Sequence, residues 1–283
     1  MPNQSKIAAL VINLDSAKER WDFQQKQLSE LDIDYQRWEA NSVDTLTDKE
    51  YERWANDWQR KLRRTEVACF LSHYRAWQYI ADSGQSFLVL EDDALLSQHL
   101  PEALLKLSTD NNVVYHHLTF ETRGRKKLIS KQGFDLCDSI ALHELFLDKT
   151  GAAAYLLTPI GAKILIDHVV QHGAGLADAL LCHTKGLKSI QSVPALAIQM
   201  DMATHYEMPE LQCEIIATSN ISTPNNIKPL SNGIVKTLKY KSKRISAQLG
   251  MGINQLKNSS DGCYQEIIPD NDSFEYLYRL IDG

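Results

Sequence analysis

The stretch at residues 7–14, Ile-Ala-Ala-Leu-Val-Ile-Asn-Leu, is mostly apolar, partly β-branched, and followed by the polar pair Asp15 and Ser16. This pattern predicts a short buried strand. Residues 17–31 then carry apolar side chains that favour a helix, and residues 33–38 return to a short strand-like pattern. A strand, a helix and a second strand in this order indicate a βαβ unit, and hence an α/β fold.

The same alternation of helices and strands continues along the chain. Residues 66–82 predict a helix, with Thr65 as its expected N-cap and Gly84 as its expected C-terminal stop. Residues 86–90, Ser-Phe-Leu-Val-Leu, predict a buried strand. The further expectations are a strand at 113–120, a basic loop at 124–131, a strand at 151–157, a helix at 161–170 opened by Thr158-Pro159, and a short helix at 176–183.

Composition sets the broad class of the protein. The chain has 283 residues, 43% hydrophobic and 23% charged, which excludes intrinsic disorder, collagen and a disulfide scaffold. A net charge of −6 argues against nucleic acid as a partner. The five cysteines form no C-x-x-C pair and are odd in number, and no segment approaches 18 consecutive apolar residues. We therefore expect a soluble protein of the reducing cytoplasm.

Residues 1–217 carry the predicted strands and helices, so we expect one main domain there and a C-terminal extension at 218–283. The extension divides into a polar linker at 218–233, a basic segment predicted to be helical, and an acidic tail at 261–282. The apolar side chains of the basic segment fall near one helical face. Two readings remain open: an interfacial helix on an anionic membrane, or packing against the core with the acidic tail neutralising the lysines.

The sharpest chemical feature is the acidic triplet Glu91, Asp92 and Asp93 at the end of the strand at 86–90. Three adjacent carboxylates repel one another unless a cation neutralises them. In open α/β sheets ligands bind at the carboxyl ends of strands, and carboxylates are the ligands that Mg²⁺ and Mn²⁺ prefer. An acidic triplet is also a common solvated turn, so the strand before it is what favours a metal site.

These residues form part of a longer series of motifs that resembles glycosyltransferase family 25, which includes lipooligosaccharide and collagen galactosyltransferases. The resemblance covers residues 7–200. The matching motifs, in chain order, are Val11-Ile12-Asn13-Leu14 with Arg20, Arg63 or Arg64, Glu66 to His73 (EVACFLSH), Phe87 to Asp93 (FLVLEDD), Gly151 to Tyr155 (GAAAY), Gly161-Ala162, Asp178, Pro194 and Gln199.

The resemblance implies a GT-A type fold, with a Rossmann-like mixed sheet flanked by helices. It also implies inverting transfer of a hexose, most often galactose from UDP-galactose, onto a core sugar of lipooligosaccharide or lipopolysaccharide, with Mn²⁺ or Mg²⁺. The expected partners are a UDP-sugar donor and an oligosaccharide acceptor on a lipid-linked core. Peripheral contact with the cytoplasmic face of the inner membrane is the option that the basic segment leaves open. The identity of the donor sugar stays open, with glucose and an N-acetylhexosamine as the alternatives to galactose.

Roles for individual residues follow from this chemistry. The leaving nucleoside diphosphate gains negative charge, which a metal ion or fixed cations must stabilise. Asp93 is the first choice as metal ligand, Glu91 reaches either the metal or the ribose, and His205 is a further candidate ligand. Asp178 is the candidate general base, with a second metal ligand or a helix-terminal carboxylate as alternatives. The candidate donor-binding residues are Asn13, Arg20, Arg63, Arg64 and Asp92.

Two other function classes stay open at this stage. A nucleotidyltransferase on a related sheet would also use an acidic metal site, but the sequence has no early Gly-rich loop to hold a triphosphate. A non-catalytic domain that binds a nucleotide or a sugar is the second alternative. Loss of turnover in Asp93→Ala with the fold preserved would favour the enzyme, and an unchanged cellular role would favour binding alone.

Overall fold

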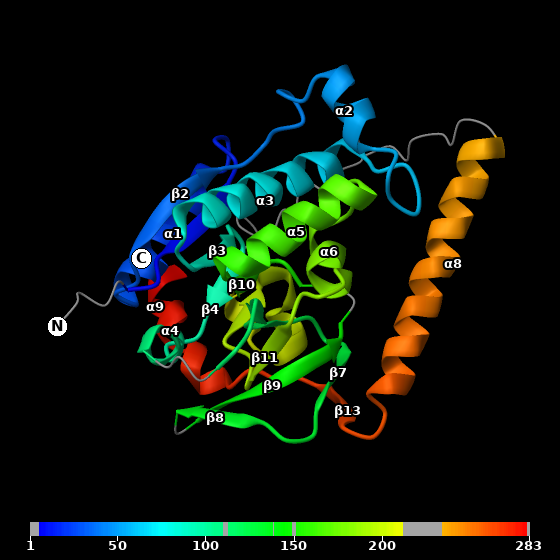
Figure 1. Cartoon of the computed structure of the whole chain (residues 1–283). Coiled ribbons are helices and arrows are strands. Elements are labelled where there is room, and N and C mark those ends of the chain that lie inside the picture. The colour runs from blue at the N-terminus through cyan, green and yellow to red at the C-terminus, as the bar shows by residue number, and fades with distance from the viewer. Residues whose placement is uncertain (1–5, 110–112, 138, 149–150, 212–233, 282–283) are drawn as a thin grey trace.

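The computed structural model describes residues 6–109, 113–137, 139–148, 151–211 and 234–281, with the side chains of 234–237 excepted. It confirms the predicted α/β class: a large mixed sheet has helices on both of its faces (Figure 1). The strands are β1 (Ala9–Asn13), β2 (Tyr35–Glu39), β3 (Phe87–Glu91), β4 (Ala94–Leu96), β5 (His117–Thr119), β6 (Glu121–Thr122), β7 (Lys126–Ser130), β8 (Phe134–Cys137), β9 (Ile140–Leu147), β10 (Ala154–Leu157), β11 (Ser189–Val193), β12 (Ala197–Gln199) and β13 (Gly262–Glu266). The helices are α1 (Lys18–Glu30), α2 (Asp48–Trp54), α3 (Arg64–Ser83), α4 (Leu100–Thr109), α5 (Pro159–His172), α6 (Ala177–His183), α8 (Ile234–Lys257) and α9 (Tyr276–Ile281), with short 3₁₀ turns η1 (Met200–Met202), η2 (Thr204–Tyr206), η3 (Pro209–Leu211) and η5 (Asn271–Phe274).

The described strands form a ten-stranded sheet and a smaller three-stranded one. The large sheet has the order β13-β7-β9-β11-β5-β10-β3-β1-β2, with β8 added to β9, and the small sheet has the order β4-β12-β6. Strand β1 runs parallel to both β2 and β3, whereas β10 runs antiparallel to β3 and β5. The predicted βαβ unit at the start of the chain is therefore present, as β1-α1-β2.

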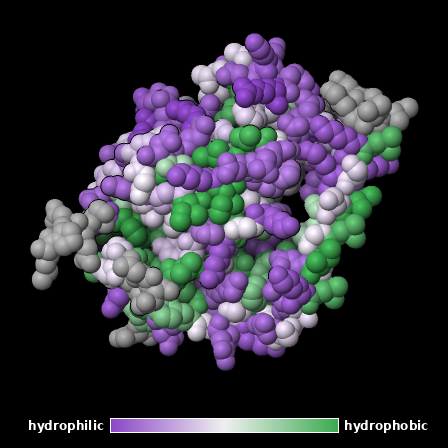
Figure 2. All heavy atoms as spheres, in the orientation of Figure 1, coloured by the Kyte–Doolittle hydropathy of each residue, from purple (hydrophilic) through white to green (hydrophobic). Residues whose placement is uncertain are grey.

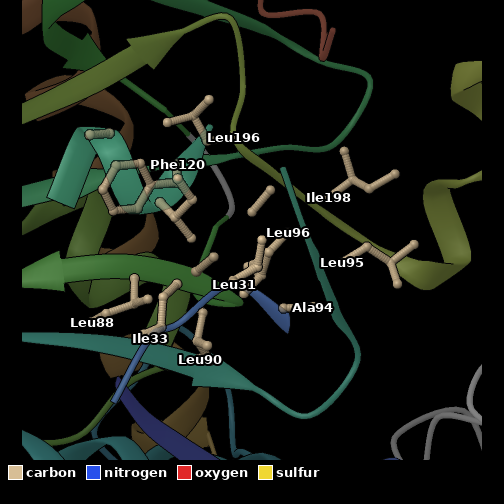
Figure 3. Close-up of a cluster of buried hydrophobic side chains, with 14 of the residues drawn as sticks. Leu31, Ile33, Leu88, Leu90, Ala94, Leu95, Leu96, Phe120, Leu196 and Ile198 are labelled. Carbon is tan, nitrogen blue, oxygen red and sulfur yellow. The ribbon is translucent and has the colours of Figure 1, made fainter. Parts of the chain in front are cut away.

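The large sheet is buried on both faces because alternate residues of its central strands enter two different cores. In β3, Leu88 and Leu90 join the core under α1, α4 and α9, whereas Phe87 and Val89 join the core under α3, α5 and α6. Strands β1 and β10 divide in the same way, as expected from the two-residue repeat of a strand. Figure 3 shows part of the first core, where side chains of β3 meet those of β4 and β12.

Helix α3 begins two residues earlier than predicted, at Arg64 instead of Glu66. Arg63, not Thr65, occupies the N-cap position, and the carboxylate of Glu66 accepts a hydrogen bond of 2.8 Å from the Arg63 backbone N–H. The carboxylate thus satisfies one of the free N–H groups of the first turn. At the other end Gly84 has a φ of 70°, the left-handed conformation expected of a glycine after a helix.

The prediction of a basic loop at residues 124–131 is wrong, because residues 126–130 form strand β7. The charge of Lys127 had favoured a loop, yet its side chain is only 2% exposed. Its ammonium group lies 2.7 Å from the carboxylate of Asp148 and donates to the side chain of Gln191 and the backbone carbonyl of Glu121. These contacts offset the free energy cost of removing the Lys127 ammonium group from water.

The C-terminal residues complete the fold. The boundary expected at residue 217 and the linker at 218–233 lie in the stretch 212–233, outside the described residues. Beyond it, β13 pairs with β7 at the edge of the large sheet, and Tyr276 and Leu277 of α9 are buried in the core beside α1. Helix α8 runs along the outside of the molecule (Figure 1). None of the described helices is long and apolar enough to cross a membrane.

Candidate active site

The acidic triplet lies at the carboxyl end of β3, next to the end of β1, where the sequence predicts a ligand site. The three side chains do not share one environment. Asp92 is buried against α1, whereas Glu91 and Asp93 are partly exposed. The alternation of side chains along an extended chain accounts for this division.

Asp92 is held by two of the predicted donor-binding residues. Asn13 donates a hydrogen bond of 2.8 Å to one carboxylate oxygen, and the guanidinium of Arg20 lies 2.7 Å from the other. Arg37 donates to the side-chain oxygen of Asn13, and Gln24 donates to the backbone carbonyl of Asp92. These bonds fix the turn after β3 to β1 and α1. Contact of Asn13, Arg20 or Asp92 with a sugar donor stays a prediction.

Glu91 lies at the end of a buried hydrogen-bond network. One carboxylate oxygen lies 3.1 Å from Nε2 of His73, and the other accepts a bond of 3.1 Å from the amide of Gln199. The second ring nitrogen of His73 lies 2.9 Å from the hydroxyl of Tyr155, which also accepts a bond from the indole N–H of Trp77. The network joins α3, β10 and the end of β12 to the last residue of β3.

The donors in this network have a consistent order. Because the indole of Trp77 can only donate, the Tyr155 oxygen accepts from it and is free to donate its own proton to Nδ1 of His73. His73 then donates from Nε2 to Glu91. Burial by itself raises the pKa of Glu91. The bond to His73 and the nearby charges of Arg123 and Arg20 act in the opposite direction and hold that pKa below its usual value.

Asp93 is in the opposite electrostatic situation. Burial, together with the charges of Glu91 and Asp92, raises the pKa of Asp93 to about 7. Its Oδ1 atom is buried and has no hydrogen-bond partner within the described residues, and the same holds for Oε1 of Gln199. The backbone carbonyl of Asp93 accepts a bond from the N–H of Met200, which directly follows Gln199. Two buried oxygen acceptors on adjoining segments thus lack a donor, which is costly unless a cation or a ligand supplies one.

The donor set here fits a hard divalent cation. Glu91 and Asp93 supply carboxylate oxygens and Gln199 an amide oxygen, the ligand types that Mg²⁺ and Mn²⁺ take. A second group, Cys69, His73 and Glu91, has its ligand atoms within 4.8 Å of one another. The hydrogen bonds of His73 explain that grouping, and burial, followed by the charges of Glu91 and Asp178, raises the pKa of the Cys69 thiol well above normal. The oxygen set is therefore the better candidate for the predicted metal.

The candidate base Asp178 lies in the first turn of α6 and accepts a hydrogen bond of 2.7 Å from the N–H of Ala179. Burial, followed by the charge of Glu91, raises its pKa above the usual value. That influence means Asp178 and Glu91 lie within electrostatic range of each other. A role for Asp178 as the base stays a prediction.

His205 lies elsewhere among the described residues. Its ring is about half exposed on η2, with Nε2 3.4 Å from a carboxylate oxygen of Glu266 and the ring edge-on to Tyr206. It is absent from the one close group of metal-ligand side chains found in the described part of the chain. A metal-binding role for His205 stays a prediction, and neither of these two contacts supports it.

The two predicted donor-binding arginines of α3 differ. Arg64 lies 2.9 Å from the carboxylate of Asp48 and donates to the carbonyl of Leu46, so its guanidinium ties α3 to the segment before it. Arg63 has no such ion pair within the described residues, and its charge lowers the pKa of Glu66. A donor contact stays a prediction for both.

Sequence reasoning missed a cation and two acids beside the site. Arg123 lies 2.8 Å from Asp201, and the Arg123 charge lowers the pKa of Glu91 while the Asp201 charge raises that of Asp93. Glu121, on β6, is 1% exposed, and burial raises its pKa to about 8. Glu121 and Arg123 directly follow the strand expected at 113–120. The rule that located Glu91, a polar residue at the end of a predicted strand, would have located them as well.

A cavity of about 580 Å³ lies between α8 and the edge of the large sheet. Arg125, Lys126 and Asp148 line it from the sheet side, and Gln248 and Gln255 line it from α8. The charge of Asp148 also raises the pKa of Asp178, so the cavity and the candidate base are electrostatic neighbours.

The model of glycosyltransferase family 25 (LPS biosynthesis protein) matches residues 6–180, more than half of the chain. The chain belongs to glycosyltransferase family 25. Family 25 motifs that lie far apart in the sequence meet in the site, since His73, Glu91, Tyr155 and Gln199 are members of one hydrogen-bond network.

The relatives of this family 25 member are distant. Procollagen galactosyltransferase 2 of Mus musculus is 28% identical over 132 residues, which are 43% of this chain and 21% of that protein. Lipooligosaccharide biosynthesis protein lic2B of Haemophilus influenzae is 26% identical over 171 residues, or 56% of this chain and 62% of that protein. The chain thus spans less than two thirds of either relative.

A solved glycosyltransferase involved in glycosylation of the PBCV-1 major capsid has 11% identity and a TM-score of 0.29. That match covers 58% of this chain and 67% of the solved one. This overlap is too low to support a conclusion.

Proposed function

We propose that this family 25 glycosyltransferase is an inverting, metal-dependent enzyme. It moves galactose from UDP-galactose, in a β linkage, onto a core sugar of lipooligosaccharide or lipopolysaccharide. The chain acts in the cytoplasm, on an acceptor carried by a lipid in the inner membrane. Family membership supports sugar transfer, and the named relatives suggest the galactosyl donor and the lipooligosaccharide acceptor.

The observation that carries the metal proposal is the unpartnered Oδ1 of Asp93 beside Glu91 at the end of β3. A buried carboxylate oxygen without a donor costs free energy, and repulsion from Glu91 and Asp92 adds to this cost. We propose that Asp93 and Glu91, with the amide oxygen of Gln199, hold Mn²⁺ or Mg²⁺. When bound, the ion supplies positive charge that stabilises the departing diphosphate.

Residues of the chain supply the general base and orient the proposed metal ligand. Asp178 takes the proton from the acceptor hydroxyl, and its raised pKa makes it a stronger base than an exposed aspartate. Its bond from the Ala179 N–H holds one oxygen in place, and we propose that the other oxygen takes the proton. The network of His73, Tyr155 and Gln199 fixes the direction of the Glu91 carboxylate. Direct attack with a single base inverts the anomeric centre.

The cavity under α8 supports the choice of an oligosaccharide acceptor. Arg125 and Lys126 have no ion pair within the described residues, so they are available to an anionic sugar. Gln248 and Gln255 place two amide side chains on the opposite wall, suited to hydroxyl groups. Tyr264, which also lines the cavity, offers an exposed ring as a surface for a sugar face.

The test is hydrolysis of UDP-sugars by the purified chain, first with Mn²⁺ and then with EDTA. We expect slow UDP release from UDP-galactose, little from UDP-glucose or UDP-N-acetylglucosamine, and none with EDTA. Release that persists in EDTA would overturn the metal proposal, and faster release from another donor would overturn the galactose assignment. If no donor releases UDP, UDP binding by calorimetry is decisive, since absence of binding rejects the donor site.

Two matched variants separate the site from general effects. Asp93→Asn removes the proposed ligand charge with little change in volume and should abolish release while circular dichroism stays unchanged. Asp135→Asn makes the same chemical change at an exposed position on β8 and should release UDP at the wild-type rate. Equal activity in both variants would reject Asp93 as a metal ligand.

A further inference from the structure

Helix α8 exposes an apolar stripe to solvent. Leu238, Ile245, Leu249, Ile253 and Leu256 are each 57–76% exposed. At 3.6 residues per turn these five side chains fall within an arc of about 80°. Figure 2 shows them as a line of hydrophobic atoms along the outer edge of the helix. Single exposed apolar residues are ordinary, but five on one face of one helix are a surface that needs an occupant.

The opposite face of α8 is the one that contacts the protein. Tyr240 is 7% exposed, and its hydroxyl donates to the side chain of Asn56. Lys243 donates to the backbone carbonyl of Asp57, and Asn254 donates to that of Phe146. The orientation of the helix is thus fixed by polar bonds on its inner side, and the apolar stripe is not an unburied core face of this chain.

Charge distinguishes between possible occupants. Helix α8 carries six basic residues and no acidic ones, whereas the whole chain has a net charge of −6, so the other residues carry −12. Lys241 and Arg244 lie on one side of the stripe and Lys239 on the other, and all three are exposed. An apolar stripe with basic flanks is the pattern of a helix that lies in the interface of an anionic membrane.

We propose that the outer face of α8 docks the enzyme on an anionic lipid surface, with the stripe among the acyl chains and the flanking cations at the headgroups. A second copy of this chain would fit the stripe less well, because two helices of charge +6 would then lie against each other. The helix lies on the surface and does not cross it. Docking would also bring the cavity beneath α8 close to the membrane, where a lipid-linked acceptor is held.

The test is co-sedimentation of the full chain with vesicles of phosphatidylglycerol and phosphatidylethanolamine, compared with phosphatidylcholine vesicles. We expect binding to the anionic vesicles that weakens as salt is added. The double variant Leu249→Gln, Ile253→Gln should bind about 100-fold more weakly, from about tenfold for each lost apolar side chain. In a variant with Lys241→Gln and Arg244→Gln, the affinity for the anionic vesicles should fall by at least about tenfold.

Matched controls come from α5, where Ile160 and Val170 are 62% and 73% exposed. Ile160→Gln, Val170→Gln should bind vesicles as the wild type does. Absence of binding to anionic vesicles overturns the proposal, as does equal binding by the α8 and α5 variants. Dimerisation in sedimentation velocity that the Leu249, Ile253 variant abolishes, without vesicle binding, would assign the stripe to a second copy instead. No donor sugar is present, so these outcomes are independent of the proposed reaction.

Discussion

The buried carboxyl of Glu121 predicts an unusual loss of stability toward high pH. Burial raises its pKa from 4.5 to about 8, and the nearby charge of Lys127 lowers it only in part. The folded protein therefore holds a proton on Glu121 at neutral pH, whereas the unfolded chain has released it. Between these two pKa values the folded state binds more protons, so the free energy of unfolding falls as pH rises and levels off above about 8.

The magnitude follows from the difference between the two pKa values. They differ by about 3.5 pH units, and each unit corresponds to about 1.4 kcal/mol, so the full effect approaches about 5 kcal/mol. Between pH 6 and 8.5 the free energy of unfolding should fall by about 2.5 kcal/mol of this total. Glu121→Gln keeps an oxygen that can accept the hydrogen bond from the Ala153 N–H, yet cannot ionise.

The assay is urea unfolding of both proteins at pH 6 and at pH 8.5. We expect the wild type to lose about 2.5 kcal/mol more than Glu121→Gln over this interval, because other titrating groups affect both proteins alike. Glu144→Gln, at an exposed position on β9, should behave as the wild type does. Parallel losses in wild type and Glu121→Gln would refute the idea that Glu121 is protonated in the folded protein.

Three further substitutions test how the fold is held together. Lys127→Met leaves the buried Asp148 without this cation and should lower the free energy of unfolding by about 3–5 kcal/mol in urea titrations; a loss below 1 kcal/mol would contradict the buried ion pair. Arg20→Met should cost about 3 kcal/mol because Asp92 loses its ion pair of 2.7 Å, and a Tm equal to that of the wild type would count against this support. Thr158→Ala removes the N-cap bond of α5 and should cost about 1 kcal/mol by thermal unfolding, with no change expected if the cap were dispensable.

Several elements set by local sequence were predictable within one or two residues, whereas the strands expected at 113–120 and 151–157 begin three or four residues later, as β5 and β10. The apolar run at 7–14 contains β1, and Thr158-Pro159 opens α5 as expected. The sequence did not predict strand β7, because the charge of Lys127 suggests a loop and its ion-pair partner, Asp148, lies 21 residues away. The N-cap of α3 was predicted at Thr65 but lies at Arg63, whose backbone N–H donates a hydrogen bond to the carboxylate of Glu66. The first miss depends on an ion pair between residues far apart in the sequence. The second depends on a bond within the first helical turn, which the choice of Thr65 as the cap overlooks.

The candidate site shows the same division between local and distant information. Position at the end of a strand is local, and it located Glu91 and Asp93 correctly at the carboxyl end of β3. The bond between Glu91 and Gln199 joins residues 108 positions apart and depends on the antiparallel pairing of β12 with β4. The sequence shows that Gln199 belongs to a motif, but only the pairing shows which carboxylate it contacts.

The acidic triplet is best understood as two structural tasks carried by adjacent residues. Asp92 is bonded to Asn13 and Arg20, so its charge is compensated in part within the chain, although burial still raises its pKa. Asp93 is exposed to the repulsion of Glu91 and Asp92, and its buried oxygen lacks a donor among the described residues. A fold that pairs one carboxylate with a cation and leaves its neighbour without a partner holds a free energy cost that a bound cation can recover. This asymmetry, rather than the number of acids, is the physical argument for placing the proposed ion at Asp93.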